Sequence, residues 1–468
     1  MYEEPIQSVR CSGSEGDTGY VSGKHATTIV ICGLGKIMKE LNITGVKVLL
    51  SRSPLQDAEP LQAWDAADEL LVSTLEQYEK PENSVCIVND SFGAITLLCK
   101  QRNDGAHFFM VSDSLLGQHA CQQNLLRNQV STERLTYLPT HRLTNDLVLE
   151  LGEGKETEGK ETEDEIQSET QGETREVEGA SAAGTHSSIH CPVDQLLFKV
   201  PKSLGQLEQQ LHLLRPLVSP NTLIIGTGMV KRIHRSTLNL IEQIIGPTTT
   251  SRATKKARLI FVKMDPDLKV DRSSYPRSFS VPNTVTKTPE SAELCGHGGV
   301  FSSADLDIGA RLLISLMPDT EGEIDMIDLG CGTGVIGVVG ALRNPQAKVT
   351  FVDESFAAIE SARQSVTNTF DPARADTMKF LTANCLDGVD DESYDLVLCN
   401  PPFHDQGSRD LDTSLNMFRE AKRVLRLGGA LRIVGNRHLA YHKKLKRIFG
   451  NVSVLGSNAK FVVLEATR

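Results

Sequence analysis

From about residue 60 onward, apolar runs of strand length alternate with amphipathic segments of helix length. This alternation is typical of a largely parallel β-sheet flanked by helices. It stops in a Ser-, Thr- and Pro-rich stretch over 265–290 and then starts again. The sequence therefore predicts an α/β fold with two tandem Rossmann-like units.

The expected elements follow the same pattern in both units. In the first unit, strands are expected over 84–89, 194–200 and 222–226, and helices over 203–217 and 236–246. In the second, strands are expected over 323–329, 348–353, 379–381, 395–400, 430–434 and 460–465.

These elements set the expected domain boundaries. Residues 1–58 form an N-terminal extension of unknown function, in which 27–32 and 45–50 have the length of short strands. The first domain is expected over 59–264, a linker over 265–290 and the second domain over 291–468.

The first domain is interrupted by a segment at about 150–190 made of Glu, Gly, Thr, Ser and Gln, with almost no apolar residues. Such a composition cannot bury enough surface to offset the entropy lost on ordering, so a disordered acidic insert is expected. The insert accounts for most of the net charge of −11, because 151–180 holds eleven acidic and three basic residues. By contrast, 419–450 holds ten basic residues and one Glu.

No apolar run approaches the ~18 residues that a membrane-spanning helix needs. Glu3 and Glu4 stand where an export signal would be basic. The ten cysteines contain no C-x-x-C pair, which argues against a structural zinc site and against a disulfide framework. We therefore expect a cytoplasmic protein with reduced thiols, no metal and no membrane contact, and nothing indicates an oligomer.

The strand expected over 323–329 ends in Asp328-Leu329 and runs into a glycine-rich turn, Gly330-Cys331-Gly332-Thr333-Gly334. Glycines let the backbone approach a ligand closely, and the following helix offers free N–H groups. Asp353 ends the next strand, where a carboxylate can accept hydrogen bonds from both ribose hydroxyls. Together these residues predict a nucleoside-binding site, with Asp328, Gly330, Cys331, Gly332, Gly334 and Asp353 as cofactor-binding candidates.

The glycines alone also fit the dinucleotide fingerprint of NAD enzymes. Asp328 favours a methyltransferase, because a carboxylate would repel a pyrophosphate and would attract the ammonium group of a methionine moiety. Asn384 and Cys385, after the short strand at 379–381, are candidate adenine contacts, although a turn Asn needs no ligand.

The tetrapeptide Asn400-Pro401-Pro402-Phe403 follows the apolar strand expected over 395–400. At the carboxyl end of that strand it lies beside the cofactor. An exocyclic base amine is a poor nucleophile because its lone pair is delocalised into the ring. The Asn400 side chain and the Pro401 carbonyl can accept its hydrogens, the prolines stiffen the turn, and Phe403 can stack on the base. We predict methyl transfer to an amine, with these four residues as the catalytic group and S-adenosylmethionine as the cofactor.

The chain resembles the ribosomal RNA large subunit methyltransferase G family, which is close to the small subunit methyltransferase C enzymes, from about residue 60 to the end without the acidic insert. The motifs that carry the resemblance are 60–68 (PLQAWDAAD), 246–250 (GPTTT), 255–258 (KKAR), 306–311 (LDIGAR), 352–355 (VDES) and 400–404 (NPPFH). The resemblance implies tandem class I methyltransferase domains, with a degenerate N-terminal one, and action on the exocyclic amine (N2) of a guanosine in large-subunit ribosomal RNA. One departure from the family is Ser303-Ala304-Asp305, where the family usually has an Arg-Thr-Gly-like stretch.

The residues support the asymmetry between the domains independently. At the turn that corresponds to the glycine-rich one, the N-terminal unit has 89–94 (NDSFGA), with one glycine. Where Asn-Pro-Pro-Phe would stand, it has 199–202 (KVPK). This unit is therefore expected to stabilise the fold and to contact RNA without binding the cofactor.

A basic cluster near the C-terminus is the candidate RNA-binding surface, although a solvated helix face would have the same pattern. Its members are Arg437, Lys443, Lys444, Lys446 and Arg447. Ribosomal RNA is the expected partner. Three alternatives remain open: a methyltransferase acting on a protein glutamine side chain, a non-catalytic RNA-binding or ribosome-assembly factor, and an NAD oxidoreductase.

Overall fold

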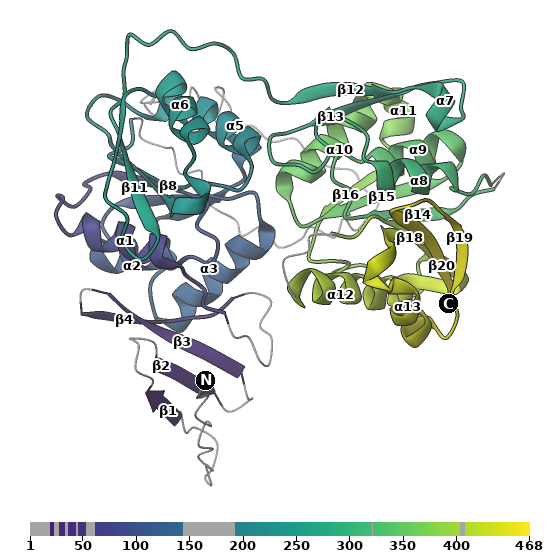
Figure 1. Ribbon diagram of the computed structural model, residues 1–468, viewed down its shortest axis with the longest axis horizontal. Helices are drawn as coiled ribbons and strands as arrows, with labels where there is room; N and C mark the ends of the chain where they lie inside the picture. Colours follow the sequence, from purple (N-terminus) through teal and green to yellow (C-terminus); the bar gives the residue numbers. More distant parts are fainter. Residues whose placement is uncertain are drawn as a thin grey trace, which may run out of the picture.

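The computed structural model describes residues 19–22, 28–32, 36–43, 45–52, 61–143, 192–320, 322–402 and 408–468. Two α/β domains lie side by side, and an extended segment after β11 connects them (Figure 1). The predicted tandem Rossmann-like architecture is confirmed. The acidic insert expected at 150–190 lies outside the described residues.

The N-terminal domain is built on a seven-stranded sheet in the order β10-β11-β9-β8-β5-β6-β7. Its strands are β5 (Ser84–Val88), β6 (His107–Val111), β7 (Leu135–Leu138), β8 (Gln195–Lys199), β9 (Leu223–Met229), β10 (Thr248–Thr250) and β11 (Ala257–Val262). The sheet packs with α1 (Ala66–Leu75), α2 (Ala94–Arg102), α3 (Leu115–Arg127), α5 (Leu204–Leu214), α6 (Arg235–Ile244) and the 3-10 turns η1 (Thr140–Arg142), η2 (Arg215–Leu217) and η3 (Val230–Arg232).

The C-terminal domain repeats this topology with the order β16-β15-β14-β17-β18-β20-β19. Its strands are β14 (Asp325–Leu329), β15 (Lys348–Asp353), β16 (Lys379–Thr382), β17 (Tyr394–Cys399), β18 (Leu425–Asn436), β19 (Ser453–Ser457) and β20 (Phe461–Thr467). Its helices are α8 (Ile308–Ser315), α9 (Val335–Arg343), α10 (Phe356–Thr369), α11 (Pro372–Ala375), α12 (Ser408–Val424) and α13 (Tyr441–Phe449), with η4 (Arg437–Leu439) after β18.

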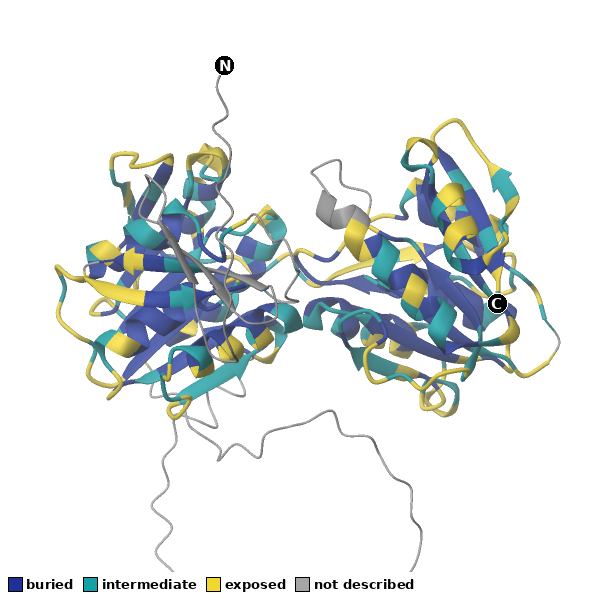
Figure 2. Ribbon diagram, turned by 90° about the horizontal axis from the view of Figure 1, so that it is seen from below, coloured by how far each residue is buried: buried dark blue, intermediate teal, exposed yellow. Residues whose placement is uncertain are grey.

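The central strands of both sheets are parallel and buried (Figure 2). Every residue of β5 is buried, and so are four of the five residues of β14. Helices cover both faces of such strands, which is why they are almost continuously apolar. Asp328 is the acidic exception among these buried positions of β5 and β14.

The boundary expected at 58 comes too late. Strands β1 (Gly19–Ser22), β2 (Thr28–Cys32), β3 (Lys36–Ile43) and β4 (Val46–Leu50) form a four-stranded antiparallel sheet. Leu41, Ile43, Val48 and Leu50 of β3 and β4 are buried in one cluster with Trp64 and residues of α2 and α3. This hairpin is therefore part of the N-terminal domain.

The linker expected over 265–290 is shorter than predicted. Strand β12 (Arg277–Val281) pairs with β13 (Ala292–Gly296), and α7 (Asn283–Thr286) follows β12. Val281 and Ala292 are buried in the core of the C-terminal domain. Part of the segment expected as a linker therefore packs on the core of the C-terminal domain. Within the described part of the chain, no helix is both long and apolar enough to cross a membrane.

Candidate active site

A cavity of about 490 Å³ opens at the carboxyl ends of β14, β15 and β17 in the C-terminal domain. Parallel strands of an open α/β sheet place ligands at this edge. The predicted site residues that line the cavity are Gly330, Cys331, Gly332, Asp353, Asn384, Cys385, Asn400, Pro401 and Pro402.

The glycine-rich turn has the backbone conformation that its sequence requires. Gly330, Gly332 and Gly334 have φ angles of 72°, 55° and 79°, which favour glycine. Gly334 begins α9, and a Cβ there would lie 2.9 Å from the Cβ of Ala362 on α10. Gly334 is the only one of these three residues that does not line the cavity; it brings α9 and α10 close together instead.

Asp353 ties the glycine-rich turn to the next strand. Its carboxylate accepts the N–H of Gly332 at 3.0 Å and the N–H of Ser355 at 3.0 Å. Burial raises the pKa of Asp353, and these backbone donors lower it. The carboxylate lines the cavity in a fixed orientation, as a ribose contact requires.

Asp328 does not line the cavity. It is fully buried behind the turn, where its carboxylate accepts the N–H of Gly337 at 2.8 Å. Its position directly before the turn is the reason that the sequence predicts a cofactor-binding residue here. In the structure the side chain of this strand residue points to the start of α9, so it supports the turn from behind.

Asn400 brings an unpaired acceptor to the cavity. Its Oδ1 is buried and has no hydrogen-bond partner in the described part of the chain. An unpaired buried acceptor is destabilising by roughly 1–3 kcal/mol, and functional sites tolerate such a cost. Pro401 and Pro402 continue the cavity wall, whereas Phe403 lies outside the described residues.

Asn384 and Cys385 form another side of the cavity. The Asn384 amide donates to Asp387 at 3.1 Å, and Cys385 Sγ accepts from Asn416 at 3.4 Å. Burial raises the pKa of Cys385 to about 11, so its thiol is neutral at neutral pH. A neutral thiol and an amide suit the flat, uncharged adenine ring.

Several lining residues were not predicted, among them Phe301, Ser302, Thr413, Met417 and Leu116. Phe301 is 53% exposed, and an exposed aromatic residue just ahead of the 306–311 motif was a usable signal. Leu116 belongs to α3 of the N-terminal domain, and no local pattern could have indicated that it reaches this cavity.

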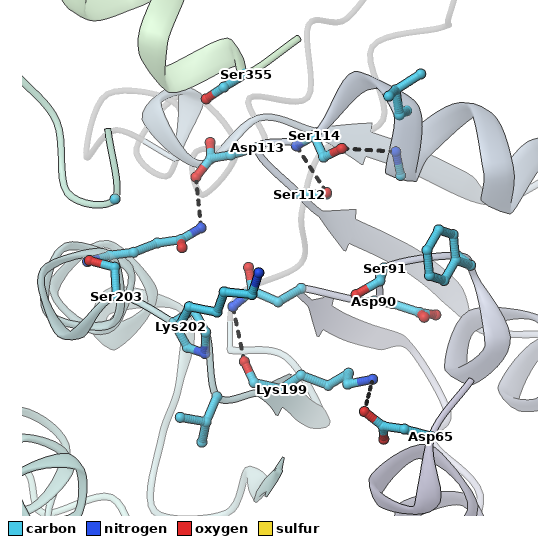
Figure 3. Close-up of a pocket in the computed structure, with 18 of the residues that line it drawn as sticks. Asp65, Asp90, Ser91, Ser112, Asp113, Ser114, Lys199, Lys202, Ser203 and Ser355 are labelled. Carbon is cyan, nitrogen blue, oxygen red and sulfur yellow. Dashed lines mark hydrogen bonds and ion pairs between the residues drawn. The ribbon is translucent and has the colours of Figure 1, made fainter. Parts of the chain in front are cut away.

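The N-terminal domain has a second cavity, of about 740 Å³, at the equivalent edge of its own sheet (Figure 3). The strand pairing shows which residues of the two domains are equivalent. In the N-terminal sheet Val88 of β5 pairs with Phe198 of β8, and in the C-terminal sheet Leu329 of β14 pairs with Cys399 of β17. The residues that follow, Lys199 and Asn400, therefore occupy equivalent positions.

The Lys199 ammonium lies 2.6 Å from Asp68 and 3.5 Å from Asp65. By the same alignment, Ser112 occupies the position of Asp353. The positions of Asn400 and Asp353 are therefore occupied here by an ion-paired lysine and a serine hydroxyl.

The basic cluster lies on η4 and α13. Helix α13 buries Tyr441, Leu445 and Phe449, which leaves Lys443, Lys446 and Arg447 exposed. Lys444 is half-buried over the ring of Tyr441, and desolvation lowers its pKa. Arg437 directly follows β18, at the same sheet edge as Asn400.

No group of three or more potential metal ligands occurs among the described residues.

Two family models cover both domains. Residues 291–465 match the methyltransferase small domain, and residues 38–150 and 172–266 match the RLMG N-terminal domain. The second match starts at residue 38, within the predicted extension. It is interrupted inside the predicted acidic insert, so that part of the insert has no counterpart in that domain family.

Curated relatives agree over nearly the whole chain. The chain is 38% identical to the ribosomal RNA large subunit methyltransferase G of Streptomyces avermitilis over 420 residues, 90% of this chain and 96% of that one. It is 38% identical to the protein of the same name from Erwinia tasmaniensis, with 92% and 100% covered. The protein of that name from Pseudoalteromonas translucida is 37% identical, with 90% and 95% covered.

A solved structure shares the two-domain fold. The T. thermophilus 16S rRNA N2 methyltransferase, solved with AdoMet and guanosine, superimposes with a TM-score of 0.63 at 15% identity. The match covers 92% of this chain and 98% of that one. S-adenosylmethionine is the cofactor of the C-terminal domain, and the cavity beside Asp353 fits its nucleoside half. The chain belongs to the ribosomal RNA large subunit methyltransferase G family.

Proposed function

We propose that this protein transfers a methyl group from S-adenosylmethionine to the exocyclic amine, N2, of a guanosine in large-subunit ribosomal RNA. The observation that carries the proposal is the unpaired, buried Oδ1 of Asn400 on the wall of the cofactor cavity. The names of the relatives support ribosomal RNA of the large subunit as the substrate. The similarity to the T. thermophilus N2 methyltransferase, solved with guanosine, supports N2 of guanosine as the methyl acceptor.

The chemistry assigned to the protein is orientation of a weak nucleophile. When bound, S-adenosylmethionine supplies an electrophilic methyl group on a sulfonium. Asn400 Oδ1 and the Pro401 carbonyl accept the two hydrogens of the amine and so direct its lone pair toward the cavity. The new C–N bond forms as the S–C bond breaks, and the nitrogen then releases one proton to solvent.

The other residues hold the cofactor or the turn. Asp353 accepts hydrogen bonds from the ribose hydroxyls, and Gly330 to Gly332 allow the backbone to approach the ligand. Asn384 and Cys385 contact the adenine ring. Phe403 stacks on the target base. Because the amine of a paired guanine is not accessible, the nucleotide must be unstacked or single-stranded.

We assign phosphate binding to Arg437, Lys443, Lys444, Lys446 and Arg447. A test reverses three charges together, as Lys443→Glu, Lys446→Glu and Arg447→Glu. We expect RNA affinity to fall at least ~10-fold and the salt dependence of binding to become shallower by about one unit for each phosphate that is no longer bound. Cofactor affinity should not change, and unchanged RNA binding at every salt concentration would show that this face is merely solvated.

The substrate class is tested with purified protein, labelled cofactor and either RNA or protein acceptors. Label in RNA, found by nucleoside mass spectrometry as N2-methylguanosine, supports the proposal. Label on a protein glutamine would establish the main alternative, since a planar amide also fits an Asn-Pro-Pro turn. Comparing large- and small-subunit RNA shows whether Ser303-Ala304-Asp305 has changed the target.

A further inference from the structure

We infer that the N-terminal domain supplies part of the cofactor pocket: Leu116 contacts the adenosine half of the cofactor, and Glu354, anchored on α3, is a positioning residue for the ribose-binding loop. This inference rests on the cofactor-binding part of the proposed function. It gives the degenerate domain a role in the catalytic site that is distinct from contacting RNA.

The domains meet through the loops that follow β6 and β15, which are equivalent strands of the two sheets. The N–H of Leu115 donates to the Glu354 carbonyl at 3.1 Å, and the N–H of Phe356 donates to the Asp113 carbonyl at 2.9 Å. Leu115 corresponds to Phe356, and Asp113 to Glu354, so the contact is reciprocal. The loop that follows Asp353 is therefore hydrogen-bonded to its own counterpart.

Side chains at this junction add hydrogen bonds to the contact, and in these the C-terminal domain supplies the acceptor. The Glu354 carboxylate accepts the Ser114 hydroxyl at 2.8 Å and also a backbone N–H from Leu116. It thus caps the N-terminus of α3, and burial raises the pKa of this carboxyl to about 7. Ser114 and Ser355 pair as an antiparallel bridge, and Figure 3 shows Ser355 beside Asp113 and Ser114.

Leu116 lies at this junction and lines both the cofactor cavity and the cavity of the N-terminal domain. It is half-buried and lines the cofactor cavity together with Asp353, Glu354 and Ser355. Because Glu354 and Ser355 directly follow Asp353, Leu116 lies at the part of the cavity that we assign to the ribose. An apolar side chain there suits the face or edge of an adenosine moiety and excludes water from it.

A second contact between the domains holds another wall of the same cavity. Gln209 of α5 hydrogen-bonds His297 Nδ1 at 2.7 Å and accepts the N–H of Gly298 at 2.7 Å. The chain then continues into Gly299 and Phe301, which line the cavity. Two segments of the cavity wall are therefore held by side chains of the N-terminal domain.

The test uses the full-length protein with Leu116→Ala. We expect the Kd for S-adenosylmethionine, measured by calorimetry, to rise roughly 5-fold because most of the apolar side chain is removed. KM for the cofactor should rise in parallel, while kcat at saturating cofactor and the Kd for RNA stay unchanged. Leu116→Met, which keeps an apolar side chain of similar size, should restore wild-type affinity.

The matched control is Leu126→Ala, because Leu126 lies on the same helix and is 63% exposed. It removes the same atoms without touching the cavity, so its cofactor Kd should equal that of the wild type. For Glu354, Glu354→Ala should weaken cofactor binding, and Glu354→Gln, which keeps an acceptor, should largely restore it.

An unchanged cofactor Kd in Leu116→Ala would overturn the inference. So would an equal loss in Leu126→Ala, or a loss accompanied by a lower unfolding temperature or weaker RNA binding, because each would assign the effect to the stability of α3. Failure of the wild-type protein to bind the cofactor would instead refute the proposed function itself.

Discussion

The two domains share a strand order but supply a carboxylate to the same helix amide from different places. In the C-terminal domain, Asp328 on the strand accepts the N–H of Gly337. In the N-terminal domain that strand position is Ile87, and Asp90 in the turn accepts the equivalent N–H, from Thr96. Because Asp328 lies on the strand before the turn, the turn itself can consist of glycines and leave space for a ligand. Asp90 lies within its turn, so its side chain takes up that space.

The comparison teaches that topology and chemistry are separable in this molecule. Both sheets bury similar central strands and bring their carboxyl ends to an open cavity. Only one of these two cavities is lined by the glycine turn, Asp353 and the Asn-Pro-Pro turn. Function here is therefore a property of three loops on a repeated scaffold.

The largest expected effect tests the turn after β17. Asn400→Ala should lower kcat by at least ~100-fold and leave cofactor affinity unchanged, because the missing hydrogen bond acts on the amine in the transition state. Single-turnover kinetics and calorimetry measure the two properties. A parallel loss of both would contradict the division of roles.

The matched control changes the equivalent position in the other domain. Lys199→Met alone would leave Asp68 buried without its cation, which is strongly destabilising. The double variant Lys199→Met with Asp68→Asn removes both charges together. Its turnover should stay within about 2-fold of the wild type, because Lys199 and Asp68 do not line the cofactor cavity. A 2-fold change corresponds to only ~0.4 kcal/mol in activation free energy.

A smaller effect is expected at Asp353, for which we propose ribose binding, and at the equivalent strand end of the N-terminal domain. Asp353→Ala should raise the cofactor Kd by roughly 10- to 100-fold, because it removes charge-assisted hydrogen bonds. The equivalent change in the N-terminal domain, Ser112→Ala, should alter it by less than about 3-fold. The Ser112 hydroxyl accepts the N–H of Ser114 at 3.2 Å in the loop that contacts Glu354. Similar losses in both variants would therefore show that this domain junction contributes as much to cofactor binding as Asp353 does.

Much of the site could be predicted because its signals are local. The glycine turn, Asp353 and Asn400 lie within a few residues of a strand end, so their positions follow from chain direction alone. The strand expected over 348–353 coincides with β15, and the first-unit strand expected over 84–89 differs from β5 by one residue.

The missed features depend on contacts that are distant in sequence. Leu116 enters the cavity only because two domains pack together, and β6 was not predicted although it carries the loop that contacts Glu354. The sequence could not show that the Asp328 side chain points to the start of α9, because the direction of a side chain at a strand end depends on the pleat. The hairpin of β3 and β4 was missed because its burial partners lie in α2 and α3.

The last comparison concerns the pH dependence of stability, and no change in turnover is needed to see it. Burial raises the pKa of Asp328 to about 8, far above its value in an unfolded chain. Between about pH 4 and pH 8 the folded state thus keeps a proton that the unfolded state releases, so this group lowers the free energy of unfolding as pH rises through that window. Asp328→Asn should remove this contribution, which is on the order of 1 kcal/mol per pH unit.

Denaturant unfolding at several pH values measures the difference between wild type and variant. Asp90→Asn should change the curve in the same direction, because burial also raises the pKa of Asp90. The two variants should nevertheless differ in ligand binding, since only the Asp328 carboxylate supports a turn that holds a cofactor. If Asp90→Asn weakened cofactor binding as much as Asp328→Asn, the two turns would not be functionally separate.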